Sequence, residues 1–162
     1  MCLISICACA DLVWKVNDLP STRAACLALA SQRGETRLRF EDDVAAAAGA
    51  DLFIVCGALH YFAEPLDAML RRLGTLPAHV LVNRVPCSSG EDRFTVQDAG
   101  SHMVACKLVS RTRLVAGMEA LGYTLRDTWP AYERRIFVPL DPGCCEPIFA
   151  GFYFSRAAGS RA

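Results

Sequence analysis

The chain has 162 residues, enough for one domain with a sizeable core, and 53% of them are hydrophobic. Its 17 basic and 17 acidic residues give a formal net charge of +0, which argues against a nucleic-acid partner held by bulk electrostatics. No apolar run approaches the roughly 20 residues of a membrane span, so we expect no membrane partner and a cytoplasmic location.

Nine cysteines are spread along the chain. The odd count and the apolar neighbours of several of them predict reduced thiols, with Cys56 buried. Their spacings lack the paired two-residue pattern of a zinc site, so we predict no metal. Residues 1–10 are apolar and end in small residues, which raises the question of a signal peptide. They lack its positive start and longer apolar region, and a first strand or a ragged start is the better interpretation.

The first half of the chain alternates between strand-like and helix-like patterns. Strands are expected at 12–16 and 36–40, with an alanine- and leucine-rich helix at 24–32 between them and a short helix at 41–49 after them. Five consecutive apolar residues, 52–56, then end in a glycine. Such a run is typical of a central strand that is covered on both faces in a parallel sheet.

The second half continues the alternation and then changes. The patterns predict a helix at 65–73, a strand at 79–83, a polar loop at 87–100, a helix at 110–121 and a strand at 123–128. Two late strands, 135–138 and 148–154, are expected to form a hairpin around a turn at 142–147.

These elements predict an α/β fold of three layers, doubly wound, with a mostly parallel sheet and an antiparallel C-terminal hairpin. We expect the parallel strands at 12–16, 36–40, 51–56 and 79–83 to share that sheet, with 52–56 the most buried. We expect a single domain over 1–156 and a disordered tail over 157–162.

Acidic residues follow the first two predicted strands. Asp18 could accept both ribose hydroxyls of a nucleotide cofactor, or it could simply cap the following helix. Asp42 and Asp43 could face an adenine amino group, or they could be acids favoured by the dipole at a helix N-terminus.

The segment Gly57-Ala58-Leu59-His60-Tyr61 follows the apolar strand at 52–56. Ligands of open α/β sheets bind beyond the carboxyl ends of such strands. His60 could act there as a base or a donor, and Tyr61 could pack on a flat ligand. The alternative is a core aromatic ring beside a surface imidazole.

Arg84 and Gln97 flank the predicted loop at 87–100. Arg84 could hold a carboxylate or phosphate of a substrate, or it could pair with Glu91 or Asp92. Cys87 lies in the same loop, but no histidine is tied to it by a motif that would indicate a nucleophile.

Glycines are absent before Gly34. A backbone cradle for phosphate or carboxylate at a helix N-terminus after the first strand is therefore not predicted.

Several short motifs, taken together, resemble a bacterial family of S-adenosylmethionine-dependent methyltransferases of class I with a Rossmann-like sheet. The resemblance covers roughly Leu12 to Phe154, and it lies in the order and spacing of the motifs rather than in any one of them. The motifs are Trp14-x-Val16-x-Asp18-Leu19-Pro20, Leu38-x-Phe40, Gly57-Ala58-Leu59-His60-Tyr61-x-x-x-Pro65, Asn83-Arg84-Val85-Pro86, Phe94-Thr95-Val96-Gln97 and Gly151-Phe152-Tyr153-Phe154.

The resemblance implies roles for individual residues. Asp18 matches the ribose-binding acid, Asp42 or Asp43 matches the acid on the adenine side, and Gly57 to Tyr61 match the motif beside the methionine end of the cofactor. Arg84 and Gln97 match positions near the acceptor pocket. The resemblance thus implies His60, Tyr61 and Arg84 as catalytic candidates and Gln97 as a substrate-binding candidate.

The family also carries an Asp-x-Gly-Gly type loop after its first strand, and this sequence has no such loop before Trp14. We therefore expect an N-terminally incomplete domain that binds S-adenosylmethionine weakly or not at all.

Three functions remain open. The first is a methyltransferase acting on an unidentified small-molecule acceptor. The second is an inactive, truncated remnant of that fold or a binding module. The third is an NAD-linked enzyme of the same topology, which a strand-end acid also fits but which the missing glycine fingerprint disfavours equally.

Overall fold

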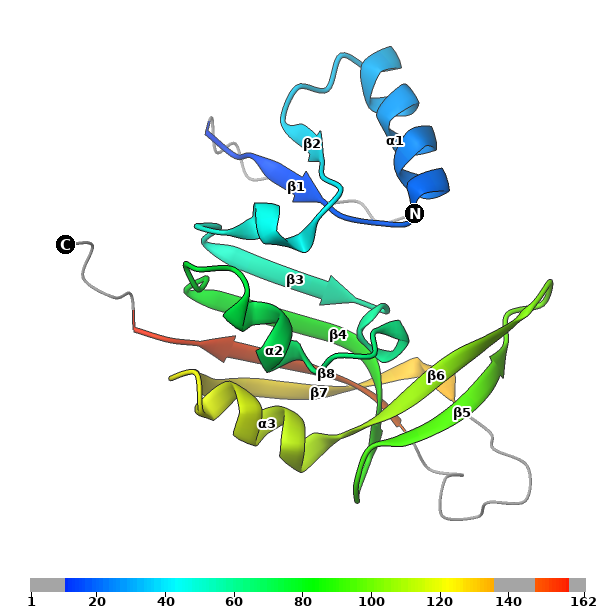
Figure 1. Ribbon diagram of the computed structural model, residues 1–162, viewed down its shortest axis with the longest axis vertical. Coiled ribbons are helices and arrows are strands. Elements are labelled where there is room, and N and C mark those ends of the chain that lie inside the picture. The colour runs from blue at the N-terminus through cyan, green and yellow to red at the C-terminus, as the bar shows by residue number, and fades with distance from the viewer. Residues whose placement is uncertain (1–10, 136–147, 158–162) are drawn as a thin grey trace. The chain divides into compact units, whose positions relative to one another are not determined.

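The computed structural model describes residues 11–135 and 148–157 (Figure 1). The chain forms two compact units, one up to Ala47 and one from Ala48 onward, and each is described here by itself.

The first unit contains two short parallel strands and one helix. Its elements are β1 (Trp14–Val16), α1 (Pro20–Gln32), β2 (Leu38–Phe40) and a 3-10 turn, η1 (Val44–Ala47). The two strands pair in parallel, with Val16 opposite Phe40, which confirms both predicted strands in shortened form. Helix α1 begins earlier than predicted because Pro20 occupies its first turn, where a missing N–H costs nothing. The helix predicted at 41–49 is only the turn η1, since so short a segment does not offset the cost of helix nucleation.

The first unit buries little of its apolar surface. Within residues 11–47, only Ala30 is buried, and Leu27 and Leu29 of α1 are 56% and 46% exposed. A groove of about 400 Å³ runs along α1 and the two strands, lined among others by Trp14, Leu29 and Phe40. The pairing of β1 with β2, rather than a packed core, therefore defines this unit.

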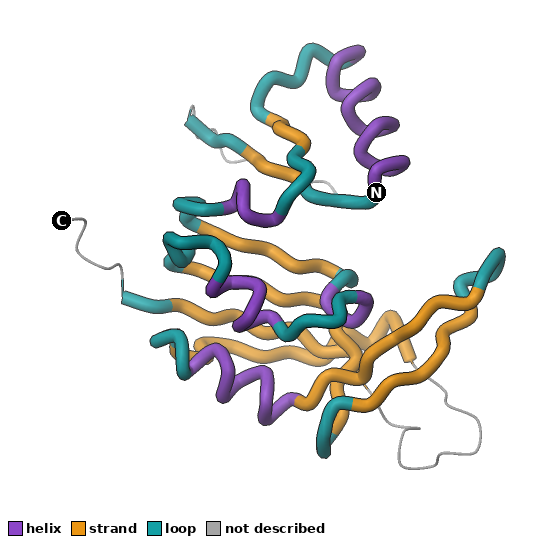
Figure 2. The backbone as a smooth tube through the Cα atoms, in the orientation of Figure 1, coloured by secondary structure: helices purple, strands orange, loops and turns teal. Residues whose placement is uncertain are grey.

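The second unit is built on a six-stranded sheet (Figure 2). Its elements are β3 (Leu52–Cys56), η2 (Leu59–Tyr61), α2 (Leu66–Arg71), β4 (His79–Ser88), β5 (Arg93–Asp98), β6 (Met103–Ser110), α3 (Arg111–Glu119), β7 (Thr124–Arg135) and β8 (Ile148–Ser155). The strand order is β5-β6-β4-β8-β7, and β3 pairs with β4. Strand β4 is parallel to β3 and β6, and the β4–β8, β5–β6 and β7–β8 pairs are antiparallel.

Helices α2 and α3 lie side by side on one face of this sheet (Figure 1). That face carries the core. Val80 and Val82 of β4 and Phe152 and Phe154 of β8 are fully buried, and Met118 of α3 is buried as well. Each fully buried side chain of this size stabilises the fold by roughly 1.5–3 kcal/mol. Helix α3 begins at Ser110, whose hydroxyl accepts a hydrogen bond from Arg113 N at 3.3 Å.

Strand β3 forms where the sequence predicts it, but its burial and its sheet partners differ from the prediction. Phe53 and Val55 are buried, whereas Leu52 is 45% and Ile54 37% exposed. Within the described residues β3 pairs with β4 alone, and β1 and β2 form a separate two-stranded sheet. The prediction that 52–56 is the most buried strand is therefore wrong. An apolar run does not say how many of its faces are covered, and the helices α2 and α3, which follow β3 and β6, both pack on the same face.

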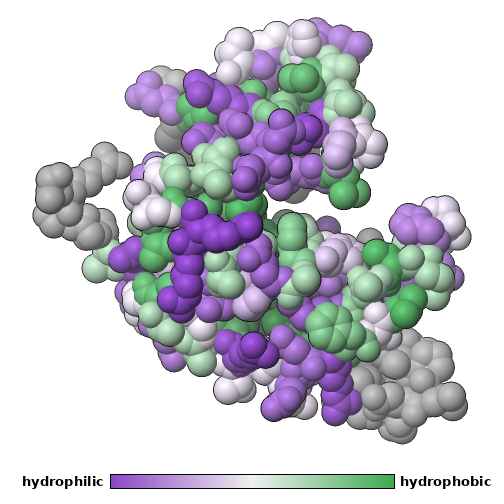
Figure 3. Space-filling view, in the orientation of Figure 1, coloured by the Kyte–Doolittle hydropathy of each residue, from purple (hydrophilic) through white to green (hydrophobic). Residues whose placement is uncertain are grey.

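The predicted loop at 87–100 is also wrong, because most of it is strand. Strand β4 continues to Ser88, and β5 forms an antiparallel hairpin with β6, a segment for which the sequence analysis predicts nothing. Phe94, Val96 and Met103 of this hairpin are 72%, 61% and 64% exposed, and apolar surface is visible on it in Figure 3. The apolar–polar alternation from Phe94 to Asp98 is the strand signal that the polar ends of the segment obscured.

The antiparallel pair at the C-terminal end of the chain is confirmed. Strand β7 runs unbroken through the predicted strand at 123–128 and on to Arg135, and it pairs with β8. Pro130 is tolerated because β7 is at the edge of the sheet, where a missing backbone N–H breaks no ladder. Residues 136–138, the turn at 142–147 and the tail at 158–162 lie outside the described residues. The single domain over 1–156 stays a prediction.

Candidate functional site

The first unit carries its candidate acids at the carboxyl ends of parallel strands. Asp18 follows β1, and Asp42 and Asp43 follow β2. Because the two strands are parallel and in register, their ends meet at the same edge, where Glu41 N donates to Val16 O at 2.9 Å. All three acids are exposed.

Each of these acids also has a local partner. Asp18 accepts a hydrogen bond from Leu19 N at 2.6 Å, and Asp43 accepts one from Ala45 N at 2.9 Å. Asp42 forms an ion pair with Arg23 of α1. The Asp43 contact is typical of a turn cap, whereas the N-cap of α1, Leu19, receives no hydrogen bond from a side chain. Asp18 and Asp43 each use one carboxylate oxygen in their hydrogen bonds with Leu19 N and Ala45 N, so the other oxygen of each is available to a ligand.

In the second unit a tight turn follows β3. Gly57 has a φ of 65°, a left-handed backbone that suits glycine, and its N–H donates at 2.9 Å to the carbonyl oxygen of Asn83, where β4 ceases to pair with β3. Ala58 is half-buried and precedes η2. Leu59 is 2% exposed and belongs to the core, so only its backbone can contact a ligand.

His60 is buried at this turn, with 4% of its surface exposed. Its ring lies against Tyr61, with 4.0 Å between the centroids, and meets the edge of Phe149 at 6.0 Å. Burial lowers the pKa of His60 to about 4, so the imidazole is neutral at pH 7. Among the described residues its Nδ1 is the one buried side-chain polar atom without a hydrogen-bond partner. Leaving such an atom unpaired costs about 1–3 kcal/mol, which a ligand could recover.

Tyr61 links this turn to the β5–β6 hairpin. Its hydroxyl donates to Gln97 Oε1 on β5 at 3.0 Å, across 36 residues of sequence. Tyr61 is 47% exposed and Gln97 is half-buried, so Tyr61 remains accessible to a bound molecule. The structure thus brings together two candidate residues that the sequence placed on separate segments.

Arg84 stands in a strained backbone at the end of the parallel part of β4. Its φ of 56° is positive, and it occupies the irregularity between Val82 and Val85 in the β4–β8 ladder. A side chain of this size costs roughly 1–2 kcal/mol in a left-handed conformation. Such strain is concentrated at functional sites, which supports Arg84 as a site residue.

Two neighbours of Arg84 were missed at the sequence level. Asn83 Oδ1 accepts hydrogen bonds from Arg84 N at 3.0 Å and from Trp129 Nε1 at 3.2 Å. Asn83, in the middle of β4, therefore contacts the residue after β3 through its backbone and the middle of β7 through its side chain. The pair Asn83-Arg84 at a strand end was a signal for it, but no local signal points to Trp129, which lies 46 residues away in the sequence.

The remaining chemical candidates are weak. Burial raises the pKa of the Cys87 thiol to about 12, although Arg111 lowers it in part, so the thiol does not ionise as a nucleophile would. Among residues 11–135 and 148–157, no three His, Cys, Asp or Glu side chains gather closely enough to hold a metal ion. No helix among those same residues is long and apolar enough to cross a membrane.

No family model and no curated protein matches the sequence, but solved structures resemble the fold. One is the 1,6-didemethyltoxoflavin-N1-methyltransferase of Burkholderia thailandensis, bound to its substrate and S-adenosylhomocysteine, with a TM-score of 0.56 and 19% identity over 89% of this chain. Another is an S-adenosylmethionine-dependent methyltransferase of Mesorhizobium loti, with a TM-score of 0.56 and 14% identity, again over 89% of this chain. The chain has the class I methyltransferase fold.

The class I fold does not by itself assign a reaction. The [4+2]-cyclase SpnF is also similar, with a TM-score of 0.58 and 14% identity over 91% of this chain and 67% of its own. The chain spans 61% of the Burkholderia enzyme and 80% of the Mesorhizobium one. Identities this low establish the fold alone.

Proposed function

We propose that this chain is a methyltransferase domain that uses S-adenosylmethionine to methylate a small molecule. The observation that carries the proposal is the turn from Gly57 to Tyr61, which ends a parallel strand in the class I fold and is tied to Gln97. When bound, the cofactor supplies an electrophilic methyl group on a sulfonium.

The proposed cofactor contacts are those of its ribose, adenine and methionine ends. Asp18 would bind the ribose hydroxyls, and Asp42 or Asp43 would face the adenine. Gly57, Ala58 and the backbone of Leu59 would contact the methionine end. The residues present fit these parts of the cofactor: the acids lie at the carboxyl edge of a parallel pair, and Gly57 adopts a backbone that a side chain would hinder.

On the acceptor side the proposal assigns binding and orientation to this chain. Methyl transfer is a direct displacement, so the protein mainly aligns the acceptor with the methyl group. Tyr61 and Gln97 would hold the acceptor through their exposed polar atoms, and Arg84 would bind an anionic group on it. His60, which is neutral, would accept or donate one hydrogen bond at Nδ1. With a pKa of about 4 it is a weak base, so it would assist an acceptor that loses its proton easily.

A second proposal is an inactive remnant or binding module of the same fold. It rests on an expectation from the sequence alone, in which the first glycine of the 162 residues is Gly34. Under both proposals the partner is a small molecule rather than nucleic acid, and a cytoplasmic location remains a prediction.

Calorimetric titration with S-adenosylhomocysteine tests both proposals by measuring the dissociation constant of the cofactor product. A glycine-rich cradle would supply backbone donors, each worth about 1.5–3 kcal/mol when charge-assisted. Losing two of them weakens binding by roughly a hundredfold or more, so we expect a dissociation constant well above the micromolar range. Adding an upstream strand and glycine loop should raise the affinity sharply. Asp18→Ala should then remove most of the gain, while Glu119→Ala, at the exposed end of α3, should not.

The outcomes separate the two proposals. A micromolar constant for the present chain would contradict the account of the missing cradle. No binding even with the added loop would contradict the methyltransferase and favour the remnant.

A further inference from the structure

A small cavity of about 20 Å³ lies where α2, α3 and β6 meet in the second unit. Its apolar walls include Leu66 and Leu114, and four charged side chains also line it: Asp67, Asp92, Lys107 and Arg113. The Arg113 side chain is 69% exposed, so the cavity is partly open to solvent, and spaces lined by polar groups are typically hydrated. Tyr61 and Gln97 do not line the cavity, whereas Leu59 of the same turn does.

Lys107 is the unusual member of this group. It is 4% exposed, although a lysine is almost never fully buried unless it is paired. Its ammonium has three N–H donors, yet among the described residues its one partner is Ala63 O, at a long 3.5 Å. No carboxylate lies within ion-pair distance of it there. The charge is thus buried with most of its hydrogen-bonding capacity unused.

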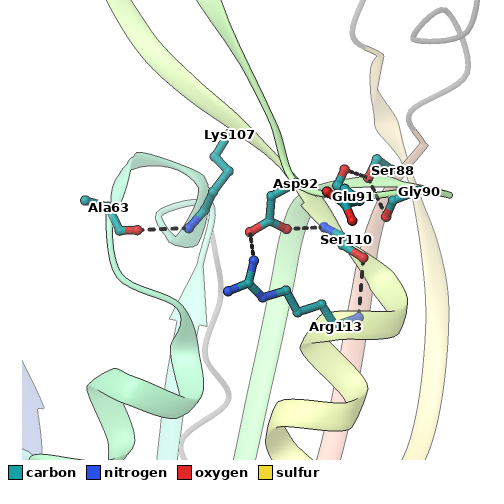
Figure 4. A network of polar contacts seen from close by, with 8 residues as sticks. All are labelled: Ala63, Ser88, Gly90, Glu91, Asp92, Lys107, Ser110 and Arg113. Carbon is teal, nitrogen blue, oxygen red and sulfur yellow. Dashed lines mark hydrogen bonds and ion pairs between the residues drawn. The ribbon is translucent and has the colours of Figure 1, made fainter.

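Asp92 also lines the cavity, and its contacts drawn in Figure 4 are with Ser110 and Arg113, whereas Lys107 reaches toward Ala63. Its Oδ1 accepts a hydrogen bond from Ser110 N at 2.7 Å, and its Oδ2 lies a loose 3.8 Å from Arg113 Nη1. Oδ2 therefore retains the capacity to accept from a further donor. A buried ammonium and an under-used carboxylate oxygen line one cavity without touching.

The size and charge of the cavity limit what can join them. Two cationic and two anionic side chains line it, so a neutral molecule fits better than an ion. Its volume is close to that needed by a single water, which requires about 10–15 Å³ and two to four polar partners. We propose that one water molecule occupies this cavity, accepting a hydrogen bond from Lys107 Nζ and donating one to Asp92 Oδ2.

The consequence is a defined link within the second unit. Lys107 contacts the carbonyl of Ala63, just after the turn that carries His60 and Tyr61. Asp92 holds the start of α3 through Ser110 and lies at the foot of β5. The bridging water would thereby connect the segment after η2 to the base of the β5–β6 hairpin.

The composition of the chain makes a sharp experiment possible, because it contains only two lysines, Lys15 and Lys107. With ¹⁵N-labelled lysine, a buried and bridged ammonium should give a sharp signal with a cross-peak to a bound water. The exposed ammonium of Lys15 should exchange with solvent at least about tenfold faster. Lys107→Met should remove the protected signal, and Lys15→Met should leave it. A crystal structure of the unaltered chain should place a water within about 3.2 Å of both Lys107 Nζ and Asp92 Oδ2.

Two results would overturn the proposal. One is a direct ion pair between Lys107 and Asp92 with no water between them. The other is a Lys107 ammonium that exchanges as fast as that of Lys15. The NMR exchange rates and the crystal structure of the unaltered chain decide the question even if Lys107→Met fails to fold. The variant Asp92→Asn retains an acceptor oxygen and should therefore keep the water.

Discussion

The indole of Trp129 packs directly on the backbone of Gly151. The two residues are register partners on β7 and β8, and a Cβ atom at position 151 would overlap the Trp129 ring. Because Gly151 has no side chain, the ring can lie over β8 while its Nε1 reaches Asn83 at 3.2 Å. Gly151 is thus required by a close approach rather than by a turn.

Gly151→Ala should therefore lower the free energy of unfolding by about 1–3 kcal/mol, as overpacking does. Urea denaturation measures it. Gly90→Ala is the matched control, because nothing lies within 4 Å of a Cβ at that position. In a Trp129→Ala background the added cost of Gly151→Ala should largely vanish. A loss below about 0.5 kcal/mol in the unaltered background would show that Trp129 moves aside freely.

Arg84 permits a test of backbone strain. Glycine in a strand usually makes a protein less stable than alanine does, by roughly 0.5–1 kcal/mol. At a φ of 56°, as at Arg84, the order of stability should reverse. We expect Arg84→Gly to be more stable than Arg84→Ala by about 1 kcal/mol, and both lose the same side chain. At Thr95, where φ is not positive, the alanine variant should be the more stable of the same pair. Equal stability of the two Arg84 variants would mean that the backbone relaxes.

His60 predicts a pH dependence of stability. Burial lowers its pKa from 6.5 to about 4, so between these values the unfolded chain binds a proton that the folded chain does not. The free energy of unfolding is therefore unaffected by His60 above pH 6.5 and decreases as the pH falls toward 4. The decrease reaches up to about 3 kcal/mol, at 1.36 kcal/mol per pKa unit. Denaturation of the unaltered chain and of His60→Phe, from pH 5 to 7.5, should show the stability difference shifting in favour of the variant as the pH falls. His102→Gln, in the exposed turn of the hairpin, is the control and should show the same dependence of stability on pH as the unaltered chain. If the stability of His60→Phe varied with pH in parallel with that of the unaltered chain, the pH dependence assigned to His60 would be refuted.

The thiols should differ in reactivity. The four cysteines that the structure describes are free, but Cys56 is exposed, contrary to the sequence prediction that it is buried. Burial raises the pKa values of Cys87 and Cys106, the former to about 12. Brief native alkylation followed by peptide mass mapping should therefore label Cys56 well before Cys87 or Cys106, and unfolding should make all three react. Early labelling of Cys106 would mean that β6 opens locally.

Local patterns in the sequence suffice for the strands β1, β2, β3 and β4 and for the helix predicted at 24–32. Each depends on apolar periodicity and on breakers such as Pro20 and Gly57, which act within a few residues. The turn after β3 could be identified as a candidate site for the same reason, because a parallel strand must end there. The β5–β6 hairpin could not be identified in this way, since β5 is stabilised by its pairing with β6. The contact of Gln97 with Tyr61 could not be identified either, because the two residues are 36 positions apart in the sequence.

By itself, then, the sequence determined the order of most elements, the class of fold and the segment 57–61 as a place for chemistry, because these depend on neighbours along the chain. Only the tertiary structure decided which face of β3 is covered, that Tyr61 meets Gln97, that Trp129 requires Gly151, and that Lys107 is buried beside Asp92. Those relationships depend on which face each helix packs against and on strands paired across long separations. Such packing is a property of the whole unit, and no window of the sequence contains it.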